Sequence, residues 1–292
     1  MKQLQNLMID ILTNGQERKT RSGVVQSVFR RDFTHDMRIS FPATLGKKLA
    51  FNAMAGEGLW FSNGDTCLGS LRVYSGLSEG ALTIWSKDCE RWNNTRRRGG
   101  HSPEDLGKLY GHQWRRFGAD DHRHGDNGVD QLQDLVTNMM TDPNSRYHIV
   151  QAYNPTDVDE ESAALPPCHT GFQIYVDKTT GEFDLDWTQR SVDVFLGLPF
   201  NIASYGWLMC VLGQITGLTP RFLYGSLKDT HLYMDHSEAI TEYLSRTPSD
   251  EPCRLRMPHI TCLEDLKYLT AADFSLENYN PQPAIKAPLS VG

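Results

Sequence analysis

The sequence lacks several patterns that would place it at once in a broad class of proteins. No stretch approaches the roughly 18 consecutive apolar residues of a membrane-spanning helix. The opening residues Met-Lys-Gln-Leu-Gln have no apolar core of the secretory type. No glycine-rich loop for dinucleotides or phosphates is present. We therefore expect a cytoplasmic protein that does not associate with membranes.

Cysteine is present without the spacing of a metal site. The six cysteines are scattered at positions 67, 89, 168, 210, 253 and 262, and none forms a Cys-X-X-Cys pair. Such cysteines are typically free thiols in a reducing compartment, and most serve as small buried apolar residues. The acids and histidines at positions 120, 121, 122, 124 and 126 suggest metal ligands, but no distant ligand set accompanies them. We interpret this segment as a solvated loop and expect no metal.

Positive charge is also scarce. The chain has 29 basic and 36 acidic residues, a formal net charge of -7. This balance argues against general nucleic-acid binding, although a local basic site is compatible with it. Arg96, Arg97 and Arg98, between Trp92 and a Gly-Gly pair, would suit an RNA-binding patch. We favour a surface loop there and expect no nucleic-acid partner.

The composition that remains is that of an ordinary globular protein. The 292 residues are 39% hydrophobic and 22% charged, enough to bury a sizeable core. Periodicity predicts helices and strands that intermix without regular βαβ units. We expect one α+β domain over residues 1–292. The expected helices are 4–12, 47–61, 129–140 and 202–217, and the expected strands are 24–29, 37–41, 148–153, 172–176, 183–188, 222–227 and 254–257.

Cys168 differs from the other cysteines in the residues that lie near it in the sequence. In Leu165-Pro166-Pro167-Cys168-His169, two prolines fix the backbone before the thiol, so its position is defined. About twenty residues later, Arg190, Ser191, Asp193 and Asn201 supply a cation, a hydroxyl, a carboxylate and an amide. This combination suits a nucleophile beside groups that hold a phosphate and a polar ring.

Four segments carry a resemblance to a known family. Residues 165–169, 189–205, 229–233 and 105–114 resemble the thymidylate synthase family, which includes the deoxypyrimidine monophosphate hydroxymethylases, and the similarity covers nearly the whole chain. The resemblance implies an enzyme of nucleotide biosynthesis, with a central mixed sheet flanked by helices. It also implies a homodimer formed through a sheet face.

The resemblance implies covalent catalysis on dUMP. The Cys168 thiolate would attack C6 of the pyrimidine, and Arg190 would lower its pKa. Glu57 would organise water and proton transfer with Tyr110 and His169, although each of these is equally compatible with a structural role. Asn201 would select uracil, because an amide can donate to O4 and accept from N3–H. Relatives that act on cytosine carry an aspartate at this place.

The remaining expected contacts also follow from the family match. For the nucleotide they are Arg21, Gln189, Arg190, Ser191, Asn201, His231 and Tyr233, with Arg146 contributed by the second subunit. The one-carbon donor would be 5,10-methylenetetrahydrofolate. Its expected contacts are Lys47, Trp85, Asp193 and Gly197. Trp85 is alternatively a core residue.

Departures from the family pattern cluster on the folate side. They are Leu45-Gly46, Ser62-Asn63, Cys67, Ser86, Tyr147, Lys228 and the tail from Pro288 to Gly292. A looser lid would admit water to the reaction. We therefore expect a dUMP 5-hydroxymethylase that makes 5-hydroxymethyl-dUMP. The first alternative is a thymidylate synthase that makes dTMP, and the second is an inactive relative acting as a nucleotide- or RNA-binding regulator.

Overall fold

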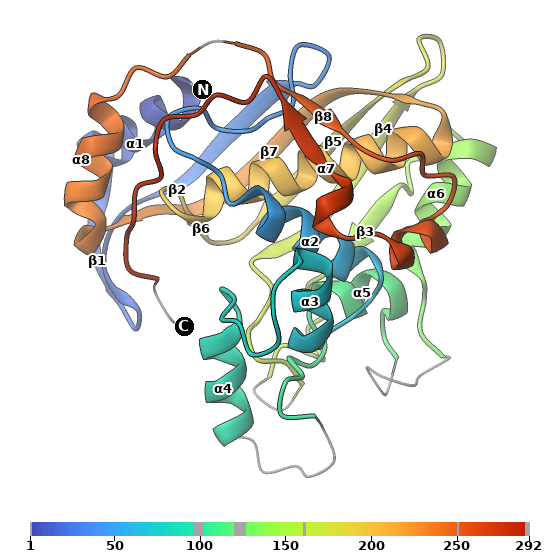
Figure 1. Cartoon of the computed structure of the whole chain (residues 1–292), viewed down its shortest axis with the longest axis horizontal. Helices are drawn as coiled ribbons and strands as arrows, with labels where there is room; N and C mark the ends of the chain where they lie inside the picture. Colours follow the sequence, from blue (N-terminus) through green and yellow to red (C-terminus); the bar gives the residue numbers. More distant parts are fainter. Residues whose placement is uncertain (1, 96–101, 120–126, 160–161, 250, 290–292) are drawn as a thin grey trace.

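A computed structural model describes residues 2–95, 102–119, 127–159, 162–249 and 251–289. Its centre is a seven-stranded mixed sheet in the order β1-β2-β7-β5-β4-β3, with β6 paired to β7 (Figure 1). The pairs β5–β7 and β6–β7 are parallel and the others are antiparallel. The strands are Gln16–Thr20 (β1), Gly23–Asp36 (β2), Ile149–Gln151 (β3), His169–Asp177 (β4), Glu182–Gln189 (β5), Val192–Asp193 (β6) and Thr219–Tyr233 (β7).

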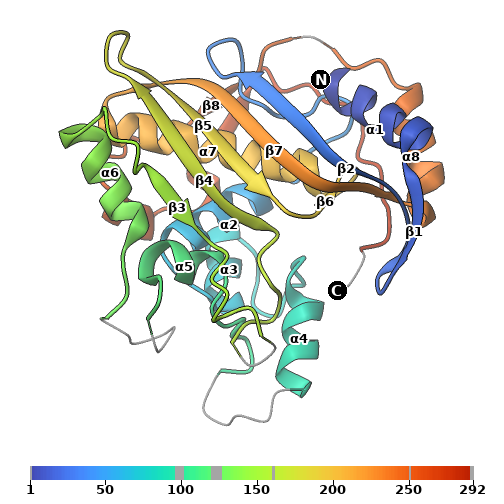
Figure 2. The same ribbon diagram turned by 180° about the vertical axis from the view of Figure 1, so that it is seen from behind.

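Helices cover one face of this sheet. The α-helices are Lys2–Asn14 (α1), Phe51–Ser62 (α2), Leu68–Ser75 (α3), Ser86–Thr95 (α4), Tyr110–Arg116 (α5), Gln131–Thr141 (α6), Gly197–Thr216 (α7) and Ser237–Ser245 (α8). Short 3₁₀ turns at Met234–His236 (η1), Leu263–Tyr268 (η2) and Ala271–Asp273 (η3) and a small sheet of Arg254–Arg256 (β8) and Ser275–Glu277 (β9) follow. The long helix α7 lies across the sheet in Figure 1, whereas in Figure 2 no helix of the described residues lies over the opposite face.

The alternation of side chains explains this arrangement. In β5 the odd-numbered Phe183, Leu185 and Trp187 are fully buried, whereas Asp184 and Asp186 between them are partly exposed. A strand with this alternation packs one face on a core and leaves the other polar. Helix α7 is apolar on most of its surface, which fits its place between the sheet and the outer helices. The expected α+β class and mixed central sheet are confirmed.

Most predicted elements lie where the periodicity places them, but several differ. Residues 37–41 form no strand, because β2 ends at Asp36 and Arg38 donates back to the Asp36 carboxylate in a turn. The helix expected from 47 begins at Phe51. Residues 16–20 lie outside every element expected from the sequence, yet they form the strand β1, in which all five residues are exposed. Helix α7 begins at Gly197, five residues before its apolar run, because Pro199 is tolerated in a first turn.

Two expectations from the sequence concern membranes and metal ions. No helix in the described ranges is long and apolar enough to cross a membrane. Within the same ranges, no group of three or more metal-ligating side chains comes together. The acids and histidines at 120, 121, 122, 124 and 126 and the arginines at 96–98 lie outside the described residues.

Candidate active site

The candidate nucleophile sits on a loop that is fixed from two sides. Arg190, which follows β5, donates from Nε to the Pro167 carbonyl (2.8 Å) and from Nη2 to the Pro166 carbonyl (2.9 Å). The backbone N–H of Cys168 donates to the hydroxyl of Tyr110 (2.7 Å), the first residue of α5. The strand end and the helix start therefore position the thiol just before β4 begins.

The same arginine acts on the electrostatics of the thiol. Burial raises the pKa of Cys168, and the nearby cations Arg190 and Arg21 oppose that shift. Arg190 Nη2 lies 4.0 Å from Cys168 Sγ. A thiolate is the reactive form of cysteine, and an adjacent guanidinium stabilises it. In the structure burial outweighs the two cations, so the pKa of Cys168 is raised overall, and Arg190 and Arg21 make the rise smaller than burial alone would.

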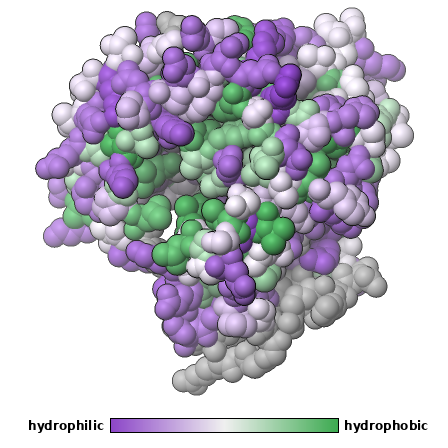
Figure 3. Space-filling model, viewed as in Figure 1, coloured by the Kyte–Doolittle hydropathy of each residue, from purple (hydrophilic) through white to green (hydrophobic). Residues whose placement is uncertain are grey.

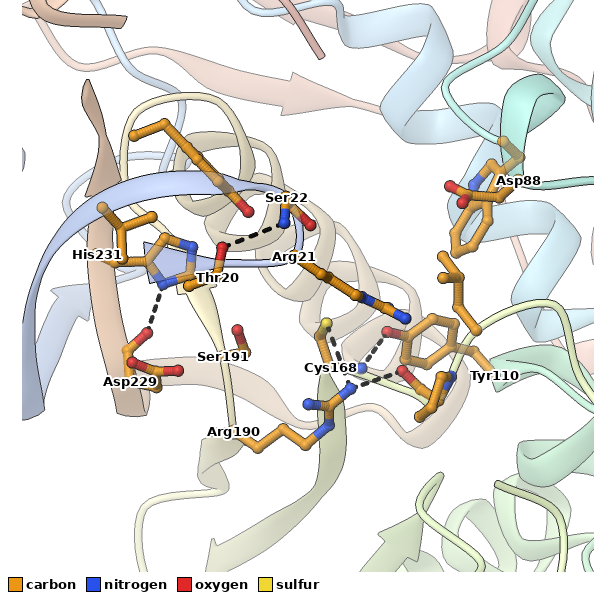
Figure 4. Close-up of a pocket in the computed structure, with 15 residues that line it drawn as sticks. Thr20, Arg21, Ser22, Asp88, Tyr110, Cys168, Arg190, Ser191, Asp229 and His231 are labelled. Carbon is orange, nitrogen blue, oxygen red and sulfur yellow. Dashed lines mark hydrogen bonds between the residues drawn. The ribbon is translucent and has the colours of Figure 1, made fainter. Parts of the chain in front are cut away.

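Two adjoining cavities open on either side of Cys168. We call the first, of about 380 Å³, the arginine cavity, because Arg21 and Arg190 line it (Figure 4). The second, of about 320 Å³, is the amide cavity, because Gln189 and Asn201 line it. The two share six lining residues: Trp85, Tyr110, Cys168, Ser191, His231 and Tyr233. They form one cleft with a cationic end and a more apolar end, and apolar surface gathers around a hollow on the face seen in Figure 3.

The arginine cavity brings together anion-binding groups from two segments. Arg21 comes from the turn between β1 and β2, and its side chain extends toward Cys168 in Figure 4. Arg190 and Ser191 follow β5. Two guanidinium groups and a hydroxyl around one space suit an anion with several oxygens, such as a phosphate.

Strand β7 supplies the wall between the cavities. His231 Nδ1 is bonded to the backbone carbonyl of Asp229 (2.7 Å), a residue with the positive φ of 40°. The rings of His231 and Tyr233 meet edge to face at 5.1 Å. Both side chains line both cavities, so they stand between the cationic and the amide end.

The amide groups of the second cavity are already oriented. Asn201 Nδ2 donates to Gln189 Oε1 (3.1 Å), and Gln189 Nε2 donates to the Ser191 carbonyl (3.0 Å). Asp193 Oδ1 accepts from the backbone N–H groups of Phe195 (3.0 Å) and Leu196 (3.2 Å), just before α7. Fixed donors and acceptors of this kind can recognise a planar polar ring.

A buried carboxyl group faces the amide cavity from α2. Glu57 accepts a hydrogen bond from Trp85 Nε1 (2.7 Å), and burial raises its pKa to about 7. His169 is half-buried, and desolvation lowers its pKa to about 4, so its imidazole is neutral near pH 7. A carboxyl group with a pKa near the working pH can both give and take a proton.

Trp85 belongs both to the cleft and to the core. Its ring lies 5.9 Å from that of Trp60 and 6.2 Å from that of Tyr110, and it lines both cavities. Ser86 Oγ, on the next residue, accepts from the N–H of Thr83 (2.8 Å) and closes the turn before α4. Trp85 therefore packs on core rings and also lines the cleft, and Ser86 supports its position. The contact of Trp85 with folate stays a prediction.

Two predicted site residues lie elsewhere in this chain. Lys47 is buried, and its ammonium group donates to the Phe195 carbonyl. Burial lowers the Lys47 pKa to about 8. Arg146 lines a separate cavity beside Tyr175 and Tyr224 on the helix-free face of the sheet. The proposed roles of Lys47 and Arg146 stay predictions.

The sequence did not identify Asp88 as a residue of the cleft, and it did not show which tail residues reach the cleft. Asp88 is buried on α4 and lines the arginine cavity, three residues after Trp85, one helical turn along. The Pro288 carbonyl is bonded to His236 Nε2 (2.8 Å), and Leu289 lines the amide cavity. The last three residues of the tail lie outside the described ranges. The looser lid that we expected from the sequence therefore stays a prediction.

One departure from the family pattern has a direct structural cause. A Cβ atom at Gly46 would lie 2.6 Å from the ring of Tyr243, so no larger residue fits there without a shift. The Tyr243 hydroxyl is in turn hydrogen-bonded to Thr44 Oγ1 (3.0 Å). The tyrosine at 243 therefore requires a glycine at 46.

Comparisons with known proteins agree with this geometry. A family model described as thymidylate synthase matches residues 2–291. The chain is 43% identical over 294 residues to a protein of Escherichia phage T5 named probable thymidylate synthase, covering 99% of this chain and 100% of that protein. It is 40% identical over 304 residues to the thymidylate synthase of Enterobacteria phage T4, covering 100% of both. The chain belongs to the thymidylate synthase family.

Proposed function

We propose that the protein is a thymidylate synthase, which methylates dUMP reductively to dTMP with 5,10-methylenetetrahydrofolate. Both relatives carry the name thymidylate synthase, which favours this alternative over the hydroxymethylase that we expected from the sequence. The observation that carries the proposal is the fixed position of Trp85. The hydrogen bond to Glu57 and the surrounding aromatic rings leave the folate-side wall supported despite its departures from the family pattern.

The cleft fits dUMP in both of its parts. The phosphate would lie in the arginine cavity against Arg21, Arg190 and Ser191. The uracil ring would lie in the amide cavity, where Asn201 supplies a donor and an acceptor. His231 and Tyr233, between the two cavities, would contact the sugar. Cys168 lines both cavities and is thus beside any nucleotide that spans them.

The residues of the amide cavity also fit a folate. Trp85 offers an aromatic wall, and Leu289 of the tail adds an apolar one. A Cβ at Gly197 would meet protein atoms only at 3.6 Å and beyond, so packing within the protein does not require a glycine here. The missing side chain instead leaves room in the cavity for a ligand. Asp193 holds the segment that leads into Gly197. When bound, methylenetetrahydrofolate supplies the one-carbon unit and the hydride.

The other steps of the proposed reaction are assigned to side chains of this protein. Cys168 adds through its thiolate to C6 of dUMP, which makes C5 a nucleophile, and Arg190 stabilises the thiolate beforehand. Glu57, with a pKa of about 7, exchanges protons with the pyrimidine. Tyr110 holds the cysteine backbone, and neutral His169 remains a hydrogen-bonding neighbour. Once the folate had supplied its hydride to the one-carbon unit, the Cys168–C6 bond would break, return its electron pair to the Cys168 thiolate and free dTMP.

Product analysis tests the proposal directly. Purified protein with dUMP and methylenetetrahydrofolate should form dTMP and dihydrofolate in equal amounts. The measurement is mass spectrometry of the nucleotide together with absorbance of dihydrofolate. If 5-hydroxymethyl-dUMP forms without dihydrofolate, the hydroxymethylase is the correct assignment. If no nucleotide product forms while dUMP binds, the inactive binding relative is favoured.

We propose further that the helix-free sheet face joins two copies. Apolar side chains on it are exposed, including Tyr175 at 64% and Ile149 at 39%, beside Arg146. Arg146 would then reach the arginine cavity of the other subunit. Sedimentation should give a dimer. A mixture of inactive Arg146→Ala and Cys168→Ala proteins should regain activity, because one site in the mixed dimer is complete. Failure of the mixture to recover, with dimers present, would show that Arg146 does not act in trans.

A further inference from the structure

A hydrogen-bond donor that lies outside the cleft contacts the amide groups of the amide cavity. Trp187 lies on β5, is fully buried and lines neither cavity. Its side chain points to the same face of the strand as that of Gln189, two residues later. Trp187 Nε1 donates to Gln189 Oε1 at 3.2 Å. An indole N–H can only donate, so it requires an acceptor at this place.

The indole of Trp187 is held by its packing. It stacks on the ring of Tyr205, with 5.1 Å between the ring centroids and 13° between the ring planes. Gly225 on the neighbouring strand β7 is paired with Trp187, and a Cβ atom there would lie 2.5 Å from the indole ring. The glycine thus provides the space that the indole fills. Because a packed core resists rearrangement, the indole N–H is a fixed donor.

These contacts give the Gln189 amide one orientation. Its Oε1 accepts from Trp187 and from Asn201 Nδ2 (3.1 Å), and its Nε2 donates to the Ser191 carbonyl (3.0 Å). A reversed amide would bring N–H against N–H at Trp187 and oxygen against oxygen at Ser191. Both changes would leave buried polar groups unpaired, which is costly. Gln189 therefore presents its oxygen to Asn201, and Asn201 must present its amide nitrogen in return.

The other neighbour of Asn201 does not impose this direction. His169 is hydrogen-bonded to Asn201, and its imidazole is neutral near pH 7. A neutral imidazole can donate or accept at a given ring nitrogen, depending on its tautomer. His169 would therefore accommodate either orientation of the Asn201 amide, and the direction comes from Gln189 and Trp187.

The orientation of the Asn201 amide decides which pyrimidine it fits. Uracil offers an acceptor at O4 and a donor at N3–H, whereas cytosine offers a donor at its 4-amino group and an acceptor at N3. An amide can bind either pair, but in opposite orientations. An amide that could reverse freely would therefore discriminate poorly between the two bases.

We propose that Trp187 is a positioning residue that sets the preference of the cleft for uracil over cytosine. It acts through Gln189, which fixes the orientation in which Asn201 meets the base. The inference rests on the proposed binding of dUMP, in which the fixed orientation is the one that fits uracil. Cytosine would then meet donor against donor and acceptor against acceptor, and such mismatches against the wrong ligand produce specificity.

Nucleotide titrations of the variant Trp187→Phe test this role. The variant keeps an aromatic ring beside Tyr205 but removes the N–H. Calorimetry gives the dissociation constants of dUMP and dCMP for the native protein and for the variant. We expect the preference for dUMP over dCMP to fall about fivefold or more, with weaker binding of dUMP and tighter binding of dCMP. Trp187→Met also lacks the donor and adapts to the space, and it replaces the first variant if that one does not fold.

Trp207→Phe is the matched control. Trp207 is a buried tryptophan of α7 that lines neither cavity, and its Nε1 has no hydrogen-bond partner among the described residues. This variant should keep the native preference. Weaker binding of both nucleotides by the same factor in Trp187→Phe would indicate a structural role only and overturn the inference, as would an unchanged preference. Either result, with native protein that binds dUMP, would leave the proposed function standing. Native protein that binds neither nucleotide would overturn both.

Discussion

The two ends of the cleft are built in different ways. At the arginine end and around Cys168, the side chains stand on or directly beside β1, β4, β5 and β7, and hydrogen bonds such as Arg190 to Pro167 fix part of this end. At the folate end, Trp85 and Leu289 stand on the loop before α4 and on the tail. In the proposed mechanism, the sheet would therefore carry the first bond-forming step, and the loops would decide how the reaction ends.

Glu57 joins the two ends. Its helix α2 packs in the core, while its carboxylate accepts from Trp85 and faces the cavity of Asn201. A change at the folate end can therefore reach the proton chemistry through a single hydrogen bond. Four variants separate the two ends experimentally.

The largest effect is expected at the nucleophile. Cys168→Ser should reduce turnover about 10⁴-fold or more, because a serine without an adjacent base is a poor nucleophile at neutral pH. Steady-state formation of dihydrofolate measures it. Cys262→Ser, at an exposed cysteine in the described part of the chain, should behave as the native protein. Near-native turnover in Cys168→Ser would exclude the covalent mechanism.

Recognition of the ring should come next in size. Asn201→Asp should lower kcat/KM for dUMP about 10²-fold, because the carboxylate can no longer donate to O4. Binding of dCMP should improve in the same variant, since its amino group donates to a carboxylate. Competition between the two nucleotides provides the measurement. Unchanged preference would show that Asn201 does not read the base.

Glu57, which links the two ends of the cleft, should make the stability of the protein depend on pH. Burial raises the Glu57 pKa from 4.5 to about 7, so between these values the folded chain keeps a proton that the unfolded chain has released. Stability attributable to Glu57 therefore falls as pH rises through this window. Relative to Glu57→Gln, the native protein should lose on the order of 3 kcal/mol of unfolding free energy across it.

Denaturant titrations of both proteins at several pH values measure this difference. Glu238→Gln, an exposed acid on α8, should follow the native protein throughout. A constant difference between native protein and Glu57→Gln would mean that Glu57 ionises in the folded state as it does in water.

The smallest effect is expected at the folate end. Trp85→Phe keeps an aromatic ring but removes the N–H that lowers the Glu57 pKa. Turnover should fall about tenfold, and the share of 5-hydroxymethyl-dUMP in the product should rise as the wall loosens. Trp114→Phe, at a buried indole outside both cavities, should not alter the product. An unchanged product in Trp85→Phe would separate the folate wall from the choice of product.

The same contrast explains what could be predicted from the sequence. Strand β5 and helix α7 have apolar patterns that report their own burial, and the motif around Cys168 lies where a strand meets a fixed loop. Strand β1 has no such pattern, because all five of its residues are exposed and only pairing with β2 makes it a strand. Asp88 escaped notice because its place beside Arg21 and Arg190 arises only where β1, β5 and α4 meet in space. Tertiary contact, not local preference, defines such residues.

The pairing of Gly46 with Tyr243 has a consequence for protein engineering. Any attempt to graft a pair of larger residues onto positions 45 and 46 would drive a side chain at 46 into the buried tyrosine ring. The graft requires a smaller residue at 243 at the same time, and the double variant should tolerate what the single one does not. Positions almost two hundred residues apart in the chain must therefore be exchanged as one unit.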